Sequence, residues 1–297
     1  MIKIFNEDFN NYNGDKVDLI FTDIPYNLGK NAYASNPQWW KDGQVKNGKS
    51  DKAHSLFFES DDNFDLDKFL TFSSKTLKED GRLITFCSVE QLSIIILNYK
   101  KYGFKKYSPL IFIKNSSAET LKANMRVVGA TEYALLFYRD RLPKFRNGAE
   151  YDPETGKAVR GTGHMVKNWF GWEYSPEEIE AMCADDCGIP DYIPWETDGR
   201  DIPKIHPTQK PVAVIRKLIE TFTDPGDVVI DPCFGSGTTA RACQELGRNF
   251  YGFEINKEFC RMAKEEMLLK PEEIEQAEQT DEKPDAMQNR RWRYRNK

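Results

Sequence analysis

The chain has 297 residues, of which 39% are hydrophobic and 13% aromatic, so it holds enough apolar side chains for a sizeable core. Its apolar runs are too short to cross a bilayer, and the N-terminus MIKIFNEDF lacks the pattern of a signal peptide. We therefore expect a cytoplasmic protein with no membrane partner. The net charge of −5 argues against a surface that is basic all over, so nucleic acid would have to contact local patches.

An alternating α/β pattern fills the first 140 residues. Runs of aliphatic and aromatic side chains predict buried strands at residues 2–5, 17–22, 82–88, 107–113 and 131–138. Apolar spacing predicts helices at residues 65–77, with the helix end at Gly81, and 89–102, stopped by Gly103. Residues 27–63 form a long polar connection, and connections of that length inside a compact domain are usually functional or disordered.

The pattern breaks over residues 141–205, which are rich in glycine, proline, acidic residues and tryptophan. One short helix is predicted there at residues 175–182, because Ser175-Pro176-Glu177-Glu178 has the composition of a capped helix start. We expect an inserted module rather than core sheet. Regular patterning resumes at residue 206, with helices predicted at 211–221, 238–246 and 256–269 and strands at 227–231 and 249–254.

Two basic stretches are candidates for contact with nucleic acid. The first lies between residues 100 and 126 and holds Lys100, Lys101, Lys105, Lys106, Lys114, Lys122 and Arg126 against the single acid Glu119. The second is the C-terminal stretch 290–297, in which cations alternate with aromatic residues. That stretch is also typical of a solvated, frayed terminus.

The six cysteines are scattered and form no Cys-x-x-Cys pair. Cys183 and Cys187, with His164 nearby, are the one candidate group for a metal, but the four-ligand spacing of structural zinc is missing. We expect reduced thiols and no metal.

A carboxylate, a proline and a tyrosine follow the strand predicted at 17–22, in Asp23-Ile24-Pro25-Tyr26. Ligands of open α/β sheets bind at the carboxyl ends of strands. Asp23 can accept one N–H of an exocyclic amine, and the Ile24 carbonyl, whose direction Pro25 restricts, can accept the second. Tyr26 offers a face on which a planar base can stack. A strand-end carboxylate is also commonly a solvated cap, so these residues alone leave both interpretations open.

A second motif follows the strand predicted at 227–231 and reads Asp231-Pro232-Cys233-Phe234-Gly235-Ser236-Gly237-Thr238. The two glycines let the backbone turn tightly and approach a ligand, and the helix that follows begins with partial positive charge for an anionic group. Glu254 stands at the end of the next strand, where an acid can bind both hydroxyls of a ribose. Strand, turn, helix and acid together favour a nucleoside site over a plain tight connection.

With His206-Pro207-Thr208-Gln209-Lys210-Pro211 between them, the two motifs resemble the beta class of amino-directed DNA methyltransferases. The hexapeptide is the most specific of the three, and the similarity covers roughly residues 4–256. The resemblance implies a Rossmann-like α/β fold that depends on S-adenosylmethionine. It implies a mostly parallel seven-stranded sheet with helices on both faces, and the Asp23 strand beside the Asp231 strand at the topological switch point.

The same resemblance divides the chain by role. Residues 1–140 are expected to be the catalytic half of the methyltransferase domain and 206–270 its cofactor-binding half, with a target-recognition region inserted at 141–205. Residues 271–297 form a charged tail. Duplex DNA is the expected partner, and the resemblance leaves room for a homodimer and a cognate restriction nuclease.

Residue roles carried over from the family concern a flipped base and a methyl donor. Asp23 and the Ile24 carbonyl would hold the target amino group beside Pro25, and Tyr26 would stack on the base. The residues expected to bind S-adenosylmethionine are Asp8, Phe9, Thr208, Lys210, Asp231, Phe234, Gly235, Ser236, Gly237, Thr238, Glu254 and Ile255. Of these, Glu254 would bind the ribose and Ile255 the adenine face, while Lys210 is equally consistent with a structural cation at a helix start.

One position departs from the family pattern, because Ile24 stands where a proline is usual. The carbonyl is kept, but some rigidity of the backbone is lost. Asp rather than Ser at position 23 resembles the members that methylate adenine N6, which is the function expected here. Cytosine-N4 methylation is the enzymatic alternative, and a non-catalytic DNA-binding module on the same fold is the other.

Overall fold

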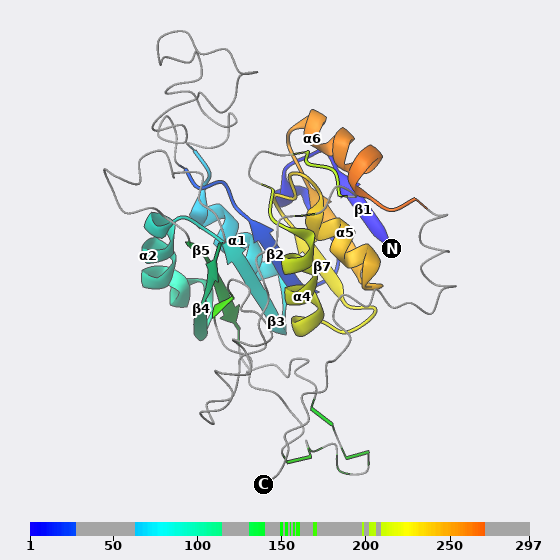
Figure 1. The fold of residues 1–297 in the computed structure, drawn as a ribbon. Coiled ribbons are helices and arrows are strands. Elements are labelled where there is room, and N and C mark those ends of the chain that lie inside the picture. The colour runs from blue at the N-terminus through cyan, green and yellow to red at the C-terminus, as the bar shows by residue number, and fades with distance from the viewer. Residues whose placement is uncertain are drawn as a thin grey trace, which may run out of the picture.

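The computed structural model describes residues 1–27, 63–114, 131–139, 149–150, 169–170, 202–205 and 209–270, together with isolated positions between 152 and 198. Its strands pair in one sheet with helices on both faces (Figure 1). The strands are β1 (Ile2–Phe5), β2 (Val17–Asp23), β3 (Leu77–Phe86), β4 (Lys106–Ile113), β5 (Thr131–Tyr138), β6 (Trp169–Phe170), β7 (Val228–Asp231) and β8 (Asn249–Phe253). All seven strands predicted from the sequence are therefore present.

The sheet has the order β1-β8-β7-β2-β3-β5-β4-β6. Every pair is parallel except those of β5, which runs antiparallel to both β3 and β4. The predicted mostly parallel sheet of seven strands is confirmed, and the two-residue strand β6 is added beside β4 at its edge. A two-residue strand is too brief to show a period, which is why the expectation of no core sheet in 141–205 missed it.

The helices are α1 (Leu66–Thr76), α2 (Val89–Asn98), α4 (Val212–Phe222), α5 (Thr238–Glu245) and α6 (Lys257–Met262). Single 3-10 turns occur at Phe9–Asn11 and Tyr99–Tyr102, and a π turn at Ala263–Met267 continues α6. Among the described helices, none is long and apolar enough to cross a membrane. The helix expected at 175–182 lies outside the described residues.

Local signals explain most helix ends. Asp65 caps α1 by accepting the N–H of Lys68, and α2 begins with a capping box between Ser88 and Gln91. Gly103 ends the turn after α2 with φ of 79°, a conformation that glycine adopts without strain. The end predicted for the first helix at Gly81 was wrong: α1 stops at Thr76, and Gly81 lies in β3, within a stretch where the pairing with β2 is irregular.

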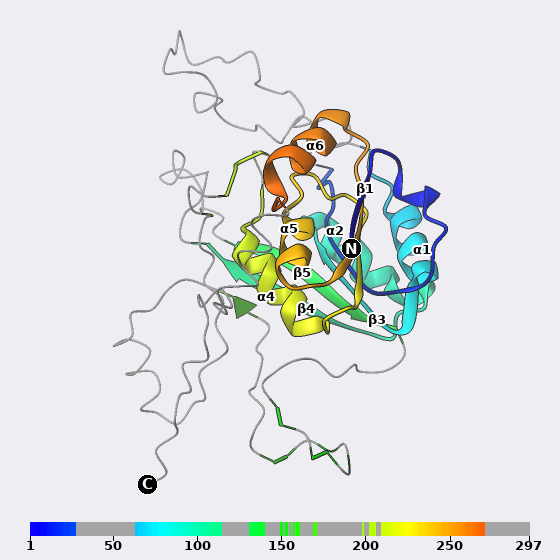
Figure 2. The same cartoon turned by 90° about the vertical axis from the view of Figure 1, so that its right-hand side faces the viewer.

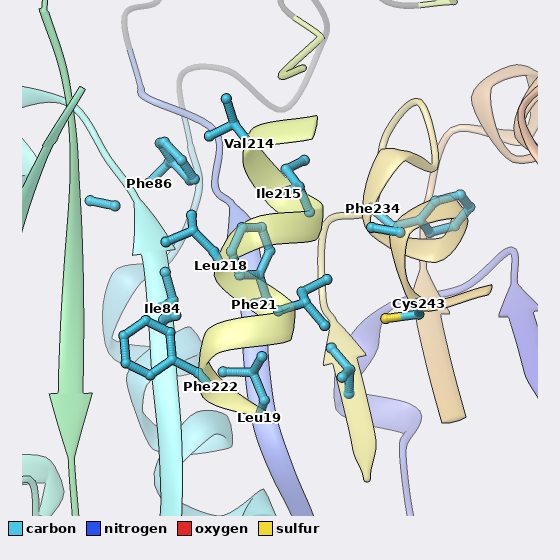
Figure 3. Close-up of a cluster of buried hydrophobic side chains, with 14 of the residues drawn as sticks. Leu19, Phe21, Ile84, Phe86, Val214, Ile215, Leu218, Phe222, Phe234 and Cys243 are labelled. Carbon is cyan, nitrogen blue, oxygen red and sulfur yellow. The ribbon is translucent and has the colours of Figure 1, made fainter. Parts of the chain in front are cut away.

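Alternate side chains of the central strand β2 enter two separate cores. Leu19 and Phe21 face α4 and α5, and Figure 3 shows Leu218 and Phe222 of α4 lying over them. Ile20, between them in sequence, packs with the other cluster, which includes residues of α1 and α2. Figure 2 accordingly shows α4 and α5 on one side of the sheet and α1 on the other. Burial on both faces makes β2 a continuous apolar run.

The register of the strands brings the two sequence motifs together. β2 and β7 are parallel neighbours, with Leu19 opposite Val229 and Ile20 opposite Ile230. Asp23 and Asp231 therefore end adjacent strands at the same edge of the sheet. From this point the chain proceeds outward in both directions, to β3 on one side and to β8 on the other. The expectation of a topological switch point between the Asp23 and Asp231 strands is confirmed.

Candidate active site

A cleft of about 750 Å³ opens at the carboxyl ends of β2, β7 and β8. Its lining includes fourteen of the sixteen residues expected from the sequence: Asp8, Phe9, Asp23, Ile24, Pro25, Tyr26, Lys210, Asp231, Phe234, Gly235, Ser236, Thr238, Glu254 and Ile255. Gly237 does not line the cleft, and Thr208 lies outside the described residues. Segments more than two hundred residues apart in the chain thus share one cavity.

The backbone of Asp23-Ile24-Pro25-Tyr26 is held from two sides. The Ile24 N–H donates to the Phe86 carbonyl at 3.4 Å, and Gln91 Nε2 donates to the Pro25 carbonyl at 2.7 Å. A proline at position 24 could not donate the first of these bonds. The Ile24 side chain is only 2% exposed and packs in the core beneath α1. A hydrogen bond and burial therefore fix the backbone at Ile24, where the sequence led us to expect some loss of rigidity.

Asp23 belongs to a row of charged groups that the sequence did not reveal. Lys210 Nζ lies 2.8 Å from Asp23 Oδ2 and 3.0 Å from Glu132 Oε2, while Glu132 Oε1 accepts a hydrogen bond from Lys114 Nζ at 2.9 Å. Lys210 is 6% exposed, and its ammonium also lies 5.3 Å from the centre of the Tyr26 ring. Two cations and two carboxylates balance one another in this row.

Burial and charge act in opposite directions on these groups. Burial raises the pKa of Asp23, and the Lys210 ammonium offsets part of that rise. For Lys210, burial favours the neutral amine, but the two carboxylates outweigh it and raise its pKa well above the usual range. Burial would also raise the pKa of Glu132, yet Lys210 and Lys114 together hold it below its usual value. Lys210 is consequently a permanent cation at neutral pH.

Two of the residues that line the cleft have a polar side-chain atom that is buried and has no hydrogen-bond partner among the described residues: Asp23 Oδ1 and the Tyr26 hydroxyl oxygen. A buried carboxylate oxygen without a donor is costly, so such an atom in a cleft points to a ligand that donates. With Oδ2 occupied by Lys210, Oδ1 is the oxygen that can accept an amino hydrogen. Burial and the nearby Asp23 charge raise the pKa of Tyr26 well above 10, so the ring stays neutral.

Glu254 marks the other end of the cleft. Its Oε1 accepts the N–H of Asn256 at 2.7 Å, and its Oε2 accepts the N–H of Gly235 at 3.1 Å. Each carboxylate oxygen can accept a second hydrogen bond, so both remain able to bind a ribose hydroxyl. Burial raises the pKa of Glu254, and the two backbone N–H groups partly offset that rise. Ile255 is 62% exposed beside it, as an apolar surface for an adenine ring.

The glycine turn has a structural as well as a ligand-facing part. Gly235 lines the cleft with φ of 49°, and Gly237 caps α5 with φ of 85°. A Cβ built on Gly237 would lie 2.9 Å from the Cβ of Ala263, so this glycine permits the close approach of the segment after α6. Gly237 is not among the residues that line the cleft, and its position requires a left-handed backbone and a close helix contact; its place beside the cofactor stays a prediction.

Asp8 and Phe9 lie where the N-terminal segment crosses the cleft. Asp8 caps the 3-10 turn by accepting the N–H of Asn10 at 2.8 Å, and Lys68 Nζ approaches its other oxygen at 3.3 Å. The Phe9 ring packs against Phe72 of α1, with 4.9 Å between ring centres. Both residues therefore reach the cleft from a firmly anchored turn.

Four functional positions were missed by sequence reasoning. Glu132 and Lys114 complete the charged row, and Gln91 holds the Pro25 carbonyl. Asn27, with φ of 54°, accepts the Phe64 N–H at 2.9 Å and donates to its carbonyl at 3.0 Å, which joins the end of the Asp23-Ile24-Pro25-Tyr26 stretch to the residues just before α1. The one available signal was an acid near the start of an otherwise apolar strand, in Thr131-Glu132-Tyr133.

The basic stretch at 100–126 does not form one surface at the cleft. Lys106 pairs across the sheet with Tyr138, and Tyr138 pairs with Arg82. Arg82 in turn pairs with Leu19, which lies four residues before Asp23 on β2. Exposed Lys100, Lys105 and Lys106 thus lie near the opposite end of the sheet, Lys101 pairs with Asp67, and Lys114 with Glu132. Lys122, Arg126 and the C-terminal stretch lie outside the described residues.

Comparison with known proteins connects the whole arrangement to one family. A model of the N6/N4 DNA methylase family matches residues 17–265. DNA adenine methyltransferase YhdJ of Escherichia coli (strain K12) is 28% identical over 250 residues, which span 84% of this chain and 75% of the relative. The structure of the M1.HpyAVI-SAM complex is 25% identical with a TM-score of 0.54, covering 89% of this chain and 98% of that chain.

A third similarity concerns the fold. The PvuII DNA methyltransferase, described as cytosine-N4-specific, gives a TM-score of 0.56 over 95% of this chain and 92% of that chain, with 16% sequence identity. At that level of identity the two proteins share their architecture, and the similarity does not extend to the choice of base.

Proposed function

Since this chain belongs to the N6/N4 DNA methylase family, we propose that it methylates the exocyclic N6 of an adenine flipped out of DNA. The protein is a DNA methyltransferase, and its methyl donor is S-adenosylmethionine. The observation that carries the choice of site is the buried oxygen Oδ1 of Asp23, a residue that lines the cleft: Oδ1 has no hydrogen-bond partner among the described residues, while Oδ2 is held by Lys210.

The residues of the cleft fit S-adenosylmethionine. Glu254 has free acceptor capacity for the ribose, Ile255 offers an apolar face for the adenine, and Asp8 lines the same cleft. Ser236 and Thr238, at the start of α5, would hold the carboxylate of the methionine part with their hydroxyl groups and with helix N–H groups. When bound, S-adenosylmethionine supplies an electrophilic methyl group on a sulfonium.

The chain's own part in the reaction is positioning. Asp23 Oδ1 and the Ile24 carbonyl accept the two hydrogens of the target amino group. These bonds draw the nitrogen lone pair out of conjugation with the ring and direct it toward the cofactor. Tyr26, neutral and buried, stacks on the flipped base. Holding two reactants in this geometry supplies most of what such a transfer needs.

Two features support adenine over cytosine as the target. Asp23 resembles the first residue of the adenine-N6 members, and the Escherichia coli relative is named a DNA adenine methyltransferase. We further propose that residues 141–205, with the segment 27–63, recognise duplex DNA. We also propose that residues 1–140 are the catalytic half, 206–270 the cofactor-binding half and 271–297 a charged tail, as expected from the sequence. A homodimer and a cognate nuclease remain predictions.

The test is incubation with labelled S-adenosylmethionine and unmethylated DNA, followed by digestion to nucleosides and mass analysis. We expect N6-methyladenine in the DNA from the parent protein. Detection of N4-methylcytosine would show that cytosine is the target base and would leave the assignment of the site unchanged. Cofactor-independent DNA binding without label would favour a non-catalytic module.

The variant Asp23→Asn tests the role of the carboxylate. It keeps the shape of the side chain but removes the charge that holds Lys210. We expect methyl transfer to fall by at least about a hundredfold, while the Kd for S-adenosylmethionine, measured by calorimetry, changes little. Full activity in this variant would contradict the assignment.

A further inference from the structure

We propose that Glu132, held by Lys114, is a positioning residue for methyl transfer: it shares the Lys210 ammonium with Asp23 and so keeps Asp23 Oδ1 without a partner and able to accept from the target amino group. Neither Glu132 nor Lys114 lines the cleft. The inference rests on the proposed role of Asp23 as acceptor of the target amino group.

The geometry is a row of alternating charge that ends in the cleft. Lys114 Nζ lies 2.9 Å from Glu132 Oε1, and Lys210 Nζ lies 3.0 Å from Glu132 Oε2 and 2.8 Å from Asp23 Oδ2. An ammonium that is 6% exposed needs compensating charge, and one carboxylate committed to a ligand would not supply it alone. Glu132 supplies the second carboxylate.

The sheet register places this row at the correct end of the molecule. Asp23 pairs with Phe86, Phe86 with Ala134, and Glu132 lies two residues beyond Ala134 toward the carboxyl end of β2. Across the next pair, Glu132 faces Phe112 of β4, and Lys114 follows two residues later on the same side of that strand. Because β5 runs antiparallel to β3, its amino end lies at the cleft edge, and Glu132 is located there.

Sharing determines how Lys210 acts on Asp23. With Glu132 ionised, the ammonium lies between two carboxylates and binds one oxygen of each. Without the charge of Glu132, Lys210 is free to move fully onto Asp23 and to contact both of its oxygens. Oδ1 would then be occupied and could no longer accept an amino hydrogen.

Other titratable groups face Asp23, and they set the direction of the expected change. They are Lys210 before α4, Glu132 on β5, Tyr26 after β2, Cys87 after β3, and Asp231 and Cys233 at the end of β7. Lys210 is the one cation among them. Removing the negative charge of Glu132 therefore lowers the pKa of Asp23, and removing Lys210 raises it.

A 13C NMR titration of the Asp23 carboxyl in the full chain, without DNA or cofactor, measures this directly. Asp23→Asn assigns the resonance. We expect the pKa of Asp23 to fall by about one unit in Glu132→Gln and to rise in Lys210→Met. If Glu132→Gln does not fold, Lys114→Met tests the same row, because it leaves Glu132 less compensated and should raise the pKa of Asp23.

The matched control is Asp18→Asn. Asp18 has the same 18% side-chain exposure as Glu132 and pairs with Lys78 at 2.7 Å, but it lies on β2 one residue before Leu19, toward the far end of the sheet. The same change of carboxylate to amide there should leave the Asp23 titration unchanged.

Kinetics give a second readout. We expect Glu132→Gln to lower kcat about ten- to a hundredfold with little change in cofactor Kd, and to cause no further loss when Lys210→Met is already present. An unchanged Asp23 pKa in Glu132→Gln, or independent losses in the double variant, would overturn the proposal. Because the titration needs no DNA, a failure of adenine methylation would not affect it.

Discussion

Two aspartates, one at the end of each central strand, have opposite surroundings: Asp231 is buried, and Asp23 is partly exposed. Asp23 faces the Lys210 ammonium, whereas Asp231 accepts hydrogen bonds from the Thr239 hydroxyl at 2.6 Å and the Cys233 N–H at 3.1 Å. Neutral donors compensate burial less than a cation does. Burial accordingly raises the pKa of Asp231 to about 7, and its two hydrogen bonds link the end of β7 to the turn and to α5.

The raised pKa of Asp231 predicts a pH-dependent contribution to stability. Between about pH 4 and 7 the folded chain keeps a proton on Asp231 that the unfolded chain has lost, so rising pH lowers the unfolding free energy by up to about 1.4 kcal/mol per unit. Asp231→Asn removes this term. Urea unfolding at pH 5 and 7 should show the stability of the variant rising relative to the parent. An identical pH dependence in both would contradict the pKa of about 7 for Asp231.

Glu254 is the residue whose replacement should affect the cofactor first. Glu254→Gln removes the charge and leaves one oxygen to serve the Gly235 and Asn256 N–H groups and the ribose. Loss of charge-assisted bonds should raise the Kd for S-adenosylmethionine about ten- to a hundredfold in calorimetry. Asp18→Asn, remote from the cleft, should bind as the parent does.

At the scale of elements, helix α2 serves the site through its first turn. Its capping box uses Gln91 Oε1 to accept the Ser88 N–H at 3.0 Å, while Nε2 of the same side chain donates to the Pro25 carbonyl. The buried side-chain amide of Gln91 thus caps the start of α2 and also holds the backbone at Pro25. The helix positions Asp23-Ile24-Pro25-Tyr26 without any of its residues entering the cleft.

Comparison of two substitutions in this turn separates capping from positioning. Ser88→Ala removes the cap alone and should cost about 1 kcal/mol of unfolding free energy with kcat unchanged. Gln91→Ala also frees the Pro25 carbonyl, so it should cost about 1–3 kcal/mol and lower kcat at least about tenfold. Chemical denaturation and steady-state kinetics measure both effects. Equal kcat values in the two variants would show that the bond to Pro25 has no catalytic role.

At the scale of the whole molecule, function is concentrated at one end of the sheet. The cleft lies at the carboxyl ends of the parallel strands, and exposed Lys105 and Lys106 lie near the opposite end, about 13 Å along the strands. Among the described residues, the lysines that line or adjoin the cleft are paired with acids: Lys68 with Asp8, Lys210 with Asp23 and Glu132, and Lys114 with Glu132. The net charge of −5 therefore does not reveal where DNA is bound.

This arrangement predicts that the exposed basic residues at the start of β4 do not serve DNA binding. The double variant Lys105→Glu with Lys106→Glu should bind duplex DNA within about twofold of the parent, with the same salt dependence, since each lost phosphate contact would lower the slope by about 0.9. Fluorescence anisotropy at several salt concentrations measures this slope. A slope reduced by nearly two would place DNA on that surface.

How much the sequence determined depends on the distance over which each signal acts. The strands, most helix ends and the motifs at Asp23 and Asp231 were predictable, because periodicity, capping and turn chemistry are local properties. Local signals also placed both motifs at strand ends, and parallel pairing then brought them into one cleft. The end of α1 was misplaced, because Leu77 continues the apolar pattern while its backbone already pairs with Val17.

Only the tertiary structure decided what surrounds the reacting groups. Lys114 belonged to a basic stretch and Glu132 to an ordinary strand in the sequence, yet both lie in one charged row with Lys210. Strands β4 and β5 bring them there by their antiparallel register, which no local pattern encodes. Which oxygen of Asp23 is free depends on that register, because the electrostatics of a buried carboxylate are set by neighbours in space rather than in sequence.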